Sequence, residues 1–216
     1  MSWGEWSERL GAFLFPAACL GCGVSSGEYL CSACRSSFHP SHGLLLQAEL
    51  RTLGSYEGVL AEAIGAVKHK GHKALGRELA RLAALAVGRR WGSNERHSVY
   101  PLRASRSGQR YRGFSLPGMM EEAVLETTGW SALDGETARR FPDSAVSSHG
   151  LNLEQRLERQ FPNRPFQTQE NREAGPILLL DDVVTSGATM GAAVSRAREL
   201  GFGPVRCFAL ALAPEA

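Results

Sequence analysis

The stretch "PILLLDDVVTSGAT", residues 176–189, restricts the fold more than any other part of the chain. Four apolar residues run directly into Asp181 and Asp182. A continuous apolar run of strand length that stops at charge is typical of a strand buried on both faces, as in parallel sheets covered by helices. The stretch therefore predicts an α/β fold with a mostly parallel central sheet flanked by helices.

The chain after residue 50 alternates between strand-like and helix-like patterns, which favours the same fold class. A last apolar run contains Cys207, which we expect to be a buried core thiol. The polar stretch 127–173 gives no ordered prediction. Strands are expected at 50–58, 97–102, 176–182 and 205–212, and helices at 59–69, 73–91, 116–125 and 188–200.

The length and composition of the chain limit the number of domains and the net charge of the folded protein. With 216 residues, 43% of them hydrophobic, the chain can bury one domain of ordinary size plus a small appendage. A net charge of +2 means that affinity for anions must come from local patches. The N-terminus resembles neither a signal peptide nor a membrane span, which favours a cytoplasmic protein. Trp3, Trp6 and Leu10 recur at helical spacing and indicate a helix docked on the core, with a membrane-surface or partner helix as the alternative.

Four of the five cysteines form two closely spaced pairs, Cys19-x2-Cys22 and Cys31-x2-Cys34. This spacing suits a tetrahedral zinc ion with four thiolates and no open position, which is a structural site. Two disulfides or a redox dithiol are the alternatives. The segment 36–47 reads as a link, so we place a cysteine module at 1–45 and the main domain at 46–216.

The residues after the expected strand suggest a ligand. Ligands of open α/β sheets bind beyond the carboxyl ends of the strands, where the acid pair lies. The following small residues and hydroxyls lead into a helix N-terminus, which attracts phosphate. Carboxylates beside a phosphate site accept hydrogen bonds from hydroxyls of the same ligand or assist Mg²⁺. A phosphorylated sugar satisfies both halves; the alternative is a strand followed by a helix-capping turn.

The same residues resemble the motif by which type I phosphoribosyltransferases bind 5-phosphoribosyl-1-pyrophosphate (PRPP). The resemblance implies that Asp181 and Asp182 meet the ribose hydroxyls and act in catalysis. It implies Mg²⁺ as a cofactor. The remaining PRPP-binding positions, around the 5-phosphate, would be Val183, Val184, Thr185, Ser186, Gly187, Ala188 and Thr189.

Over the whole chain, the order of motifs is similar to the ComF (ComFC/GntX-like) family of competence-associated proteins. The cysteine module is followed by "YEGVLAEAIGAVKHKG", by "VYPLRASRSGQRYRGF" and then by the PRPP motif. In that family the basic segment resembles a pyrophosphate-binding and active-site loop, although four arginines in ten residues are also compatible with a solvated surface loop. The loop candidates are Arg103, Arg106, Arg110 and Arg112.

This chain departs from the family at two places. Arg-Gly-Phe is followed by Ser115, Leu116 and Pro117 where family members commonly carry Asn-Gln-Ala, and only Arg156 matches a later polar segment. Both departures fall where a base acceptor or a catalytic loop would act. The resemblance therefore implies PRPP binding more directly than turnover.

A second basic cluster, "KHKGHK", supplies Lys68, Lys70 and Lys73 as candidate nucleic-acid contacts, with ligand phosphates or a solvated turn as alternatives. The resemblance implies a role in natural transformation: DNA uptake and handling of single-stranded DNA, with a competence helicase or translocase as partner. The alternatives are a Mg²⁺-dependent transferase in nucleobase salvage and a PRPP sensor without chemistry.

Overall fold

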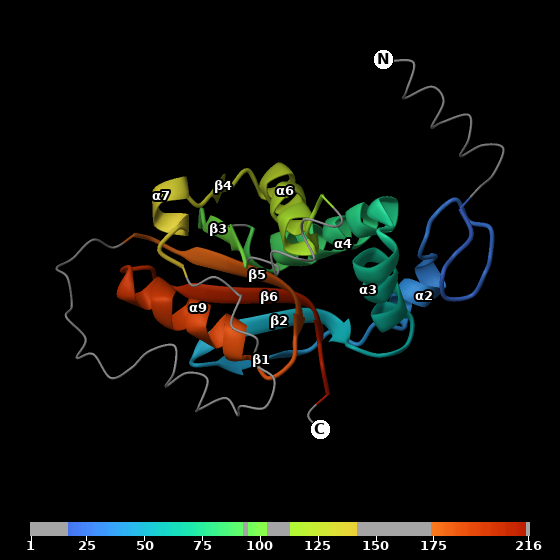
Figure 1. Ribbon diagram of the computed structural model, residues 1–216, viewed down its shortest axis with the longest axis horizontal. Coiled ribbons are helices and arrows are strands. Elements are labelled where there is room, and N and C mark those ends of the chain that lie inside the picture. Colours follow the sequence, from blue (N-terminus) through green and yellow to red (C-terminus); the bar gives the residue numbers. More distant parts are fainter. Residues whose placement is uncertain (1–16, 93–94, 103–112, 142–173, 215–216) are drawn as a thin grey trace, which may run out of the picture.

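A computed structural model describes residues 17–92, 95–102, 113–141 and 174–214, and its central element is a six-stranded sheet (Figure 1). The strand order is β1-β2-β6-β5-β3-β4. Only β1 pairs antiparallel, with β2; the other pairs are parallel. The predicted α/β class with a mostly parallel sheet is thus confirmed. The strands are β1 His42–Leu45, β2 Ala48–Ser55, β3 Ser98–Pro101, β4 Ser131–Ala132, β5 Ile177–Val184 and β6 Val205–Leu212.

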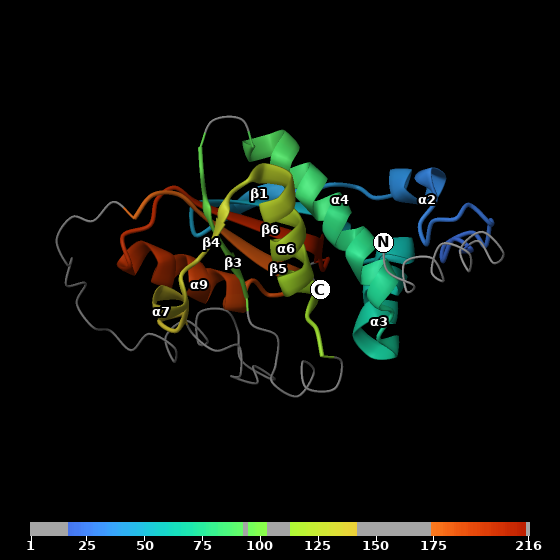
Figure 2. The same cartoon turned by 90° about the horizontal axis from the view of Figure 1, so that it is seen from above.

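Helices cover both faces of the sheet, as Figures 1 and 2 show. On one face α9 packs against the sheet, and on the other lie α3, α4 and α6. Side chains of β5 alternate between the two cores: Leu178 and Leu180 face α3, α4 and α6, while Ile177 and Leu179 face α9. The helices are α2 Ser32–Ser36, α3 Gly58–Lys70, α4 Lys73–Trp91, α6 Leu116–Thr128, α7 Gly135–Ala138 and α9 Ala188–Glu199.

The main correction among these elements concerns the end of β5. The sequence predicted that this strand stops at the acid pair, but it continues to Val184. Val183 and Val184 remain paired in register with Ala211 and Leu212 of β6, which keeps the backbone extended. The two acids therefore lie inside the extended strand, near its end. The turn that leads into the next helix begins only at residue 185. Burial of Cys207 in β6 is confirmed.

The segment 36–47, which the sequence indicated to be a link, contains β1. This strand pairs with β2 through a tight hairpin whose turn residues, Leu46 and Gln47, both have positive φ, 48° and 62°. Residue 45, where we placed the end of the cysteine module, is the last residue of this strand. A hairpin turn of this type normally carries Asn or Gly. Because Leu46 and Gln47 occupy it here, the sequence did not indicate a hairpin.

Several predictions lie outside the described residues. They concern the N-terminal helix with Trp3, Trp6 and Leu10, the segment with Arg156, and the four loop arginines 103, 106, 110 and 112. Within the described part of the chain, no helix combines the length and the apolar character that a membrane crossing requires.

Candidate functional site

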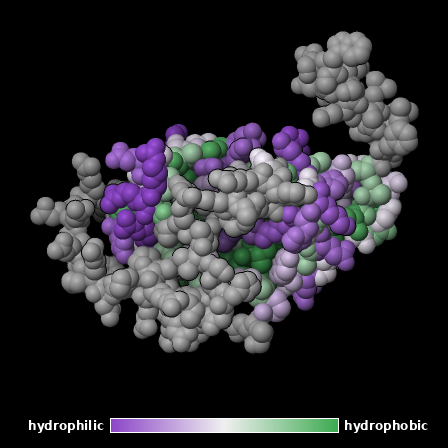
Figure 3. Space-filling view, in the orientation of Figure 1, coloured by the Kyte–Doolittle hydropathy of each residue, from purple (hydrophilic) through white to green (hydrophobic). Residues whose placement is uncertain are grey.

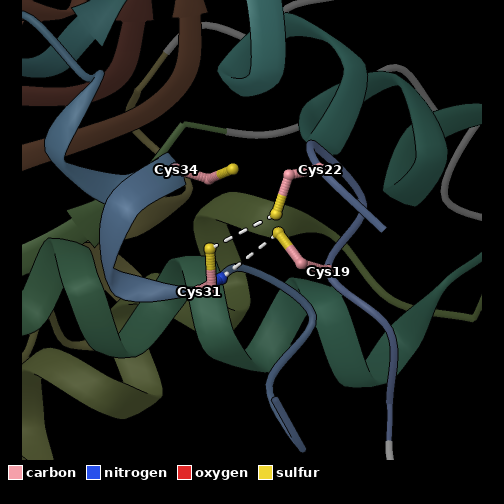
Figure 4. Close-up of side chains that lie close together, drawn as sticks. All are labelled: Cys19, Cys22, Cys31 and Cys34. Atoms are coloured by element: carbon pink, nitrogen blue, oxygen red, sulfur yellow. Dashed lines mark hydrogen bonds between the residues drawn. The ribbon is translucent and has the colours of Figure 1, made fainter. Parts of the chain in front are cut away.

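The four cysteines of the two pairs converge on one point (Figure 4). Their Sγ atoms all lie within 4.8 Å of one another. Zinc–sulfur bonds of about 2.3 Å in a tetrahedron separate the sulfurs by roughly 3.8 Å, so a small inward shift would complete a zinc site. None of the described cysteines forms a disulfide. The predicted set Cys19, Cys22, Cys31 and Cys34 is a cluster that can hold a metal ion such as zinc.

The charges in this cluster favour a cation. The backbone N–H of Cys31 donates to Cys19 Sγ at 3.3 Å and lowers the pKa of Cys19 to about 6. Hydrogen bonding with Cys19 and burial raise the pKa of Cys34 to about 12. Four thiols this close do not all ionise alone, because each thiolate repels the next. A divalent cation removes that penalty and releases the remaining protons.

The loop that carries the cysteines is packed against the α/β domain. Leu30, between the two pairs, is fully buried in the same core as α3, α4 and α6. A side chain at Gly21 would meet Cys34 Sγ and Val59 of α3 within 2.9 Å, so this glycine is required for close packing. Two apolar residues of the same loop, Leu20 and Val24, are exposed, and Figure 3 shows hydrophobic residues at the surface at this end of the molecule.

The acid pair lies at the other candidate site, near the carboxyl end of β5. Asp182 forms an ion pair with Lys68 of α3, with Nζ and Oδ1 2.7 Å apart. The Asp182 N–H donates to Asp181 Oδ1 at 2.8 Å, and the Val183 N–H donates to Asp182 Oδ1 at 2.7 Å. The two carboxylates are therefore fixed in place by backbone donors and one ammonium group.

The acid pair binds a proton more readily than an ordinary carboxylate does, through Asp181. Burial, and then the neighbouring Asp182 carboxylate, raise the pKa of Asp181 to about 8. Lys68 opposes this rise only in part. Near neutral pH the pair consequently shares about one proton and carries about one negative charge. Such a pair can both accept and donate hydrogen bonds to the hydroxyl groups of a ligand.

This pKa predicts a pH-dependent effect of Asp181→Asn on stability. Between pH 3.8 and 8 the folded protein holds a proton that the unfolded chain loses, so the contribution of Asp181 to stability falls as pH rises through this window. Asparagine does not titrate. We expect the variant to match wild type near pH 4 and to exceed it at pH 9 by several kcal/mol, because each pKa unit of difference is worth ~1.4 kcal/mol.

Thermal unfolding at a series of pH values measures this difference. Asp134→Asn is the matched control, because Asp134 Oδ1 accepts the N–H groups of Glu136 and Thr137, and these bonds lower its pKa. That variant should lower Tm at neutral pH. A Tm difference for Asp181→Asn that is the same at pH 4 and pH 9 would contradict the assignment.

The turn after β5 presents the N-terminus of α9 to the same edge. Gly187 is the N-cap residue with φ 72°, and it has no side chain with which to cap the helix. Thr185, Ser186 and Thr189 are exposed around it, whereas Ala188 is buried. The first backbone N–H groups of a helix have no partner inside it, and with the helix dipole they attract an anion. Gly187 is covered by Leu45 of β1, which lies 3.1 Å from where a Cβ would be.

The basic cluster 68–73 is divided by the fold. Lys68 faces the acid pair, while Lys70 and Lys73 are exposed at the α3–α4 corner. Lys73 also lines a cleft of about 500 Å³ between α4 and α6, whose lining includes the acidic residues Glu122 and Glu126. Sequence reasoning missed the contact of Lys68 with Asp182, because 114 residues separate the two and no local pattern links them.

The comparisons with known proteins do not assign the chain to a family. No protein-family model matches the chain, and no curated protein matches it.

Proposed function

We propose that this chain binds PRPP at the carboxyl edge of its sheet, in the manner of a type I phosphoribosyltransferase, and serves as a cytoplasmic ComF-like protein of natural transformation. The observation that carries the proposal is the position of the acid pair near the carboxyl end of β5, with Asp182 only five residues before Gly187, the N-cap of α9. A ligand at this edge meets hydroxyl partners and phosphate partners together, and PRPP offers both groups.

Each residue of the proposed site has a separate task. Asp182 accepts hydrogen bonds from the ribose hydroxyls, and Asp181, protonated at neutral pH, completes the contact. The backbone of Ser186 to Thr189 surrounds the 5-phosphate. Lys68 holds Asp182 in place and adds a positive charge at the side where phosphates approach.

Magnesium fits the proposal as an ion that arrives with the ligand. Mg²⁺ keeps several waters and binds through substrate phosphates plus one or two carboxylates. One carboxylate oxygen of Asp182 is already paired with Lys68, so Asp182 can offer the Mg²⁺ ion little more than its other oxygen. We propose that the pyrophosphate of PRPP supplies the main Mg²⁺ ligands, where the ion would neutralise the charge of the leaving group.

The part of the proposal that concerns DNA rests on the resemblance of motif order to ComF proteins. Of the three lysines predicted to contact nucleic acid, Lys70 and Lys73 are exposed and could meet phosphates of single-stranded DNA. A competence helicase or translocase is the proposed partner. Use of PRPP by a salvage transferase is the second candidate, and the same acid pair would serve it.

Calorimetric titration tests the ligand class. We expect PRPP to bind the native protein, and ribose 5-phosphate to bind more tightly than 2-deoxyribose 5-phosphate. A lost hydrogen bond to a charged acid costs about 1.5–3 kcal/mol, which is roughly 10- to 100-fold in affinity. Asp182→Asn should abolish most of the preference for ribose 5-phosphate, because the substitution removes the carboxylate proposed to accept the hydrogen bond from the ribose hydroxyl.

Glu62→Gln is the control, because Glu62 is an acid on α3 that is not among the predicted PRPP-binding residues. Titrations with and without Mg²⁺ separate the contribution of the ion. Equal affinity for the two sugars in the native protein, or no binding of PRPP by folded protein, would overturn the proposed function.

A further inference from the structure

A carboxylate from the α/β domain holds the loop between the two cysteine pairs. Glu78, in the second turn of α4, accepts the Tyr29 N–H through Oε2 and the Leu30 N–H through Oε1, both at 3.0 Å. Arg35 adds an ion-pair contact to Oε1 at 3.9 Å. The Glu78 side chain is only 17% exposed, so these bonds are shielded from competing water.

The next backbone amide after Tyr29 and Leu30, that of Cys31, forms a hydrogen bond within the cysteine cluster. The Cys31 N–H donates to Cys19 Sγ, so three consecutive amides point to two acceptors: two to Glu78 and one to a cluster sulfur. The Tyr29 carbonyl accepts the Leu20 N–H at 2.8 Å, which ties this run to the first cysteine pair. The direction in which Cys31 enters the cluster is therefore set by a residue that is not a ligand.

A second contact fixes the same run from the side. The ring of Tyr29 meets His72 edge-on, with 4.6 Å between centroids. His72 is the N-cap residue of α4 and accepts the Leu75 N–H. Leu30 fills the core beneath. Residues 29–31 are thus held at three points: by Glu78 of α4, by His72, which caps α4, and by the core around Leu30. All three contacts require the folded α/β domain.

From these contacts we propose that Glu78 is a positioning residue of the metal centre. It holds residues 29–31 in the geometry that four-thiolate coordination needs, so metal affinity depends on the folded α4 helix. Outer partners that orient metal ligands typically change affinity 10- to 100-fold. The dependence is reciprocal, and metal binding therefore stabilises the α/β domain through Glu78. This inference does not depend on PRPP binding.

Glu78→Gln tests the proposal with little change of shape. Glutamine keeps one acceptor oxygen but turns an NH₂ group toward a backbone N–H, so one of the two bonds is lost. We expect Zn²⁺, measured by competition with a chelator, to bind the variant at least 10-fold more weakly. The absorption spectrum of the Co²⁺-substituted variant should still show four-thiolate coordination, because the ligands are unchanged.

The Tm separates a positioning role from a merely structural one. If Glu78 only stabilised the fold, the variant would lose the same number of degrees with and without Zn²⁺. We expect instead that the rise in Tm on adding Zn²⁺ shrinks in the variant. Glu126→Gln, an exposed acid on α6, should keep the wild-type rise and affinity. Unchanged Zn²⁺ affinity in Glu78→Gln overturns the proposal.

Hydrogen exchange of the wild-type protein decides the matter if the variant does not fold. With Zn²⁺ bound, the amides of Tyr29 and Leu30 should be protected as strongly as the interior of α4. Removal of the metal should lower their protection while α4 stays protected. Fast exchange of these two amides in the zinc-loaded protein would show that Glu78 does not hold them, and would refute the inference.

Discussion

Leu30→Ala is expected to lower the free energy of unfolding of the zinc-loaded protein by about 3 kcal/mol. Leu30 belongs to the cysteine loop by sequence, yet its side chain has no exposed surface and lies in the core formed with α3, α4 and α6. The substitution leaves a cavity inside the α/β domain. For a domain of this size the loss corresponds to a fall in Tm of roughly 6–12 °C.

Thermal unfolding followed by far-ultraviolet circular dichroism measures this effect, since the helices of the α/β domain dominate that signal. Val24→Ala is the control from the same loop: Val24 is 50% exposed, and we expect a change within about 0.5 kcal/mol. A variant Leu30→Ala that unfolds at the wild-type temperature would mean that the cysteine loop and the α/β domain are stable independently.

Gly187→Ala is expected to cost about 2 kcal/mol of stability and to weaken binding of PRPP at least 10-fold. Gly187 adopts φ 72°, a conformation that costs a residue with a Cβ about 1–2 kcal/mol. The new methyl group would also lie 3.1 Å from Leu45 Cδ1, so either the Leu45 side chain or this turn would have to shift slightly. Any shift of this turn moves the first amides of α9, which are the proposed phosphate donors.

The same substitution at Gly65 is the matched control. Gly65 lies inside α3, where an added Cβ would meet no other atom within 4 Å. Alanine is the better helix former there, so Gly65→Ala should raise stability by about 0.5–1 kcal/mol and leave ligand binding unchanged. Denaturant unfolding and PRPP titration on both variants test the pair. Stabilisation by Gly187→Ala, or wild-type PRPP affinity, would contradict this account.

Local patterns predicted much of the fold. The helix expected at 73–91 is α4 with the same bounds, because its apolar residues recur with helical period over five turns. The buried strand β5 and the cysteine cluster also followed from short stretches of chain. In each case the signal is contained within about twenty neighbouring residues, where periodicity or ligand spacing is visible.

Features set by distant contacts could not be predicted. Lys68 with Asp182, and Glu78 with Tyr29, depend on segments that meet only after the sheet is assembled. The strand β1 was missed because four residues are too few for a periodic signal, and its turn uses Leu46 and Gln47 in conformations that favour other residues. The order of strands in the sheet was likewise invisible in the sequence.

That strand order has a consequence for synthesis of the protein. β6 is the last of the described strands in chain order, yet it lies in the middle of the sheet, between β2 and β5. Until residues 205–212 leave the ribosome, β1 and β2 on one side and β3, β4 and β5 on the other present two open edges to other chains. Insertion of β6 closes both edges at once. Nascent chains stalled before residue 205 should therefore be the species most in need of chaperones.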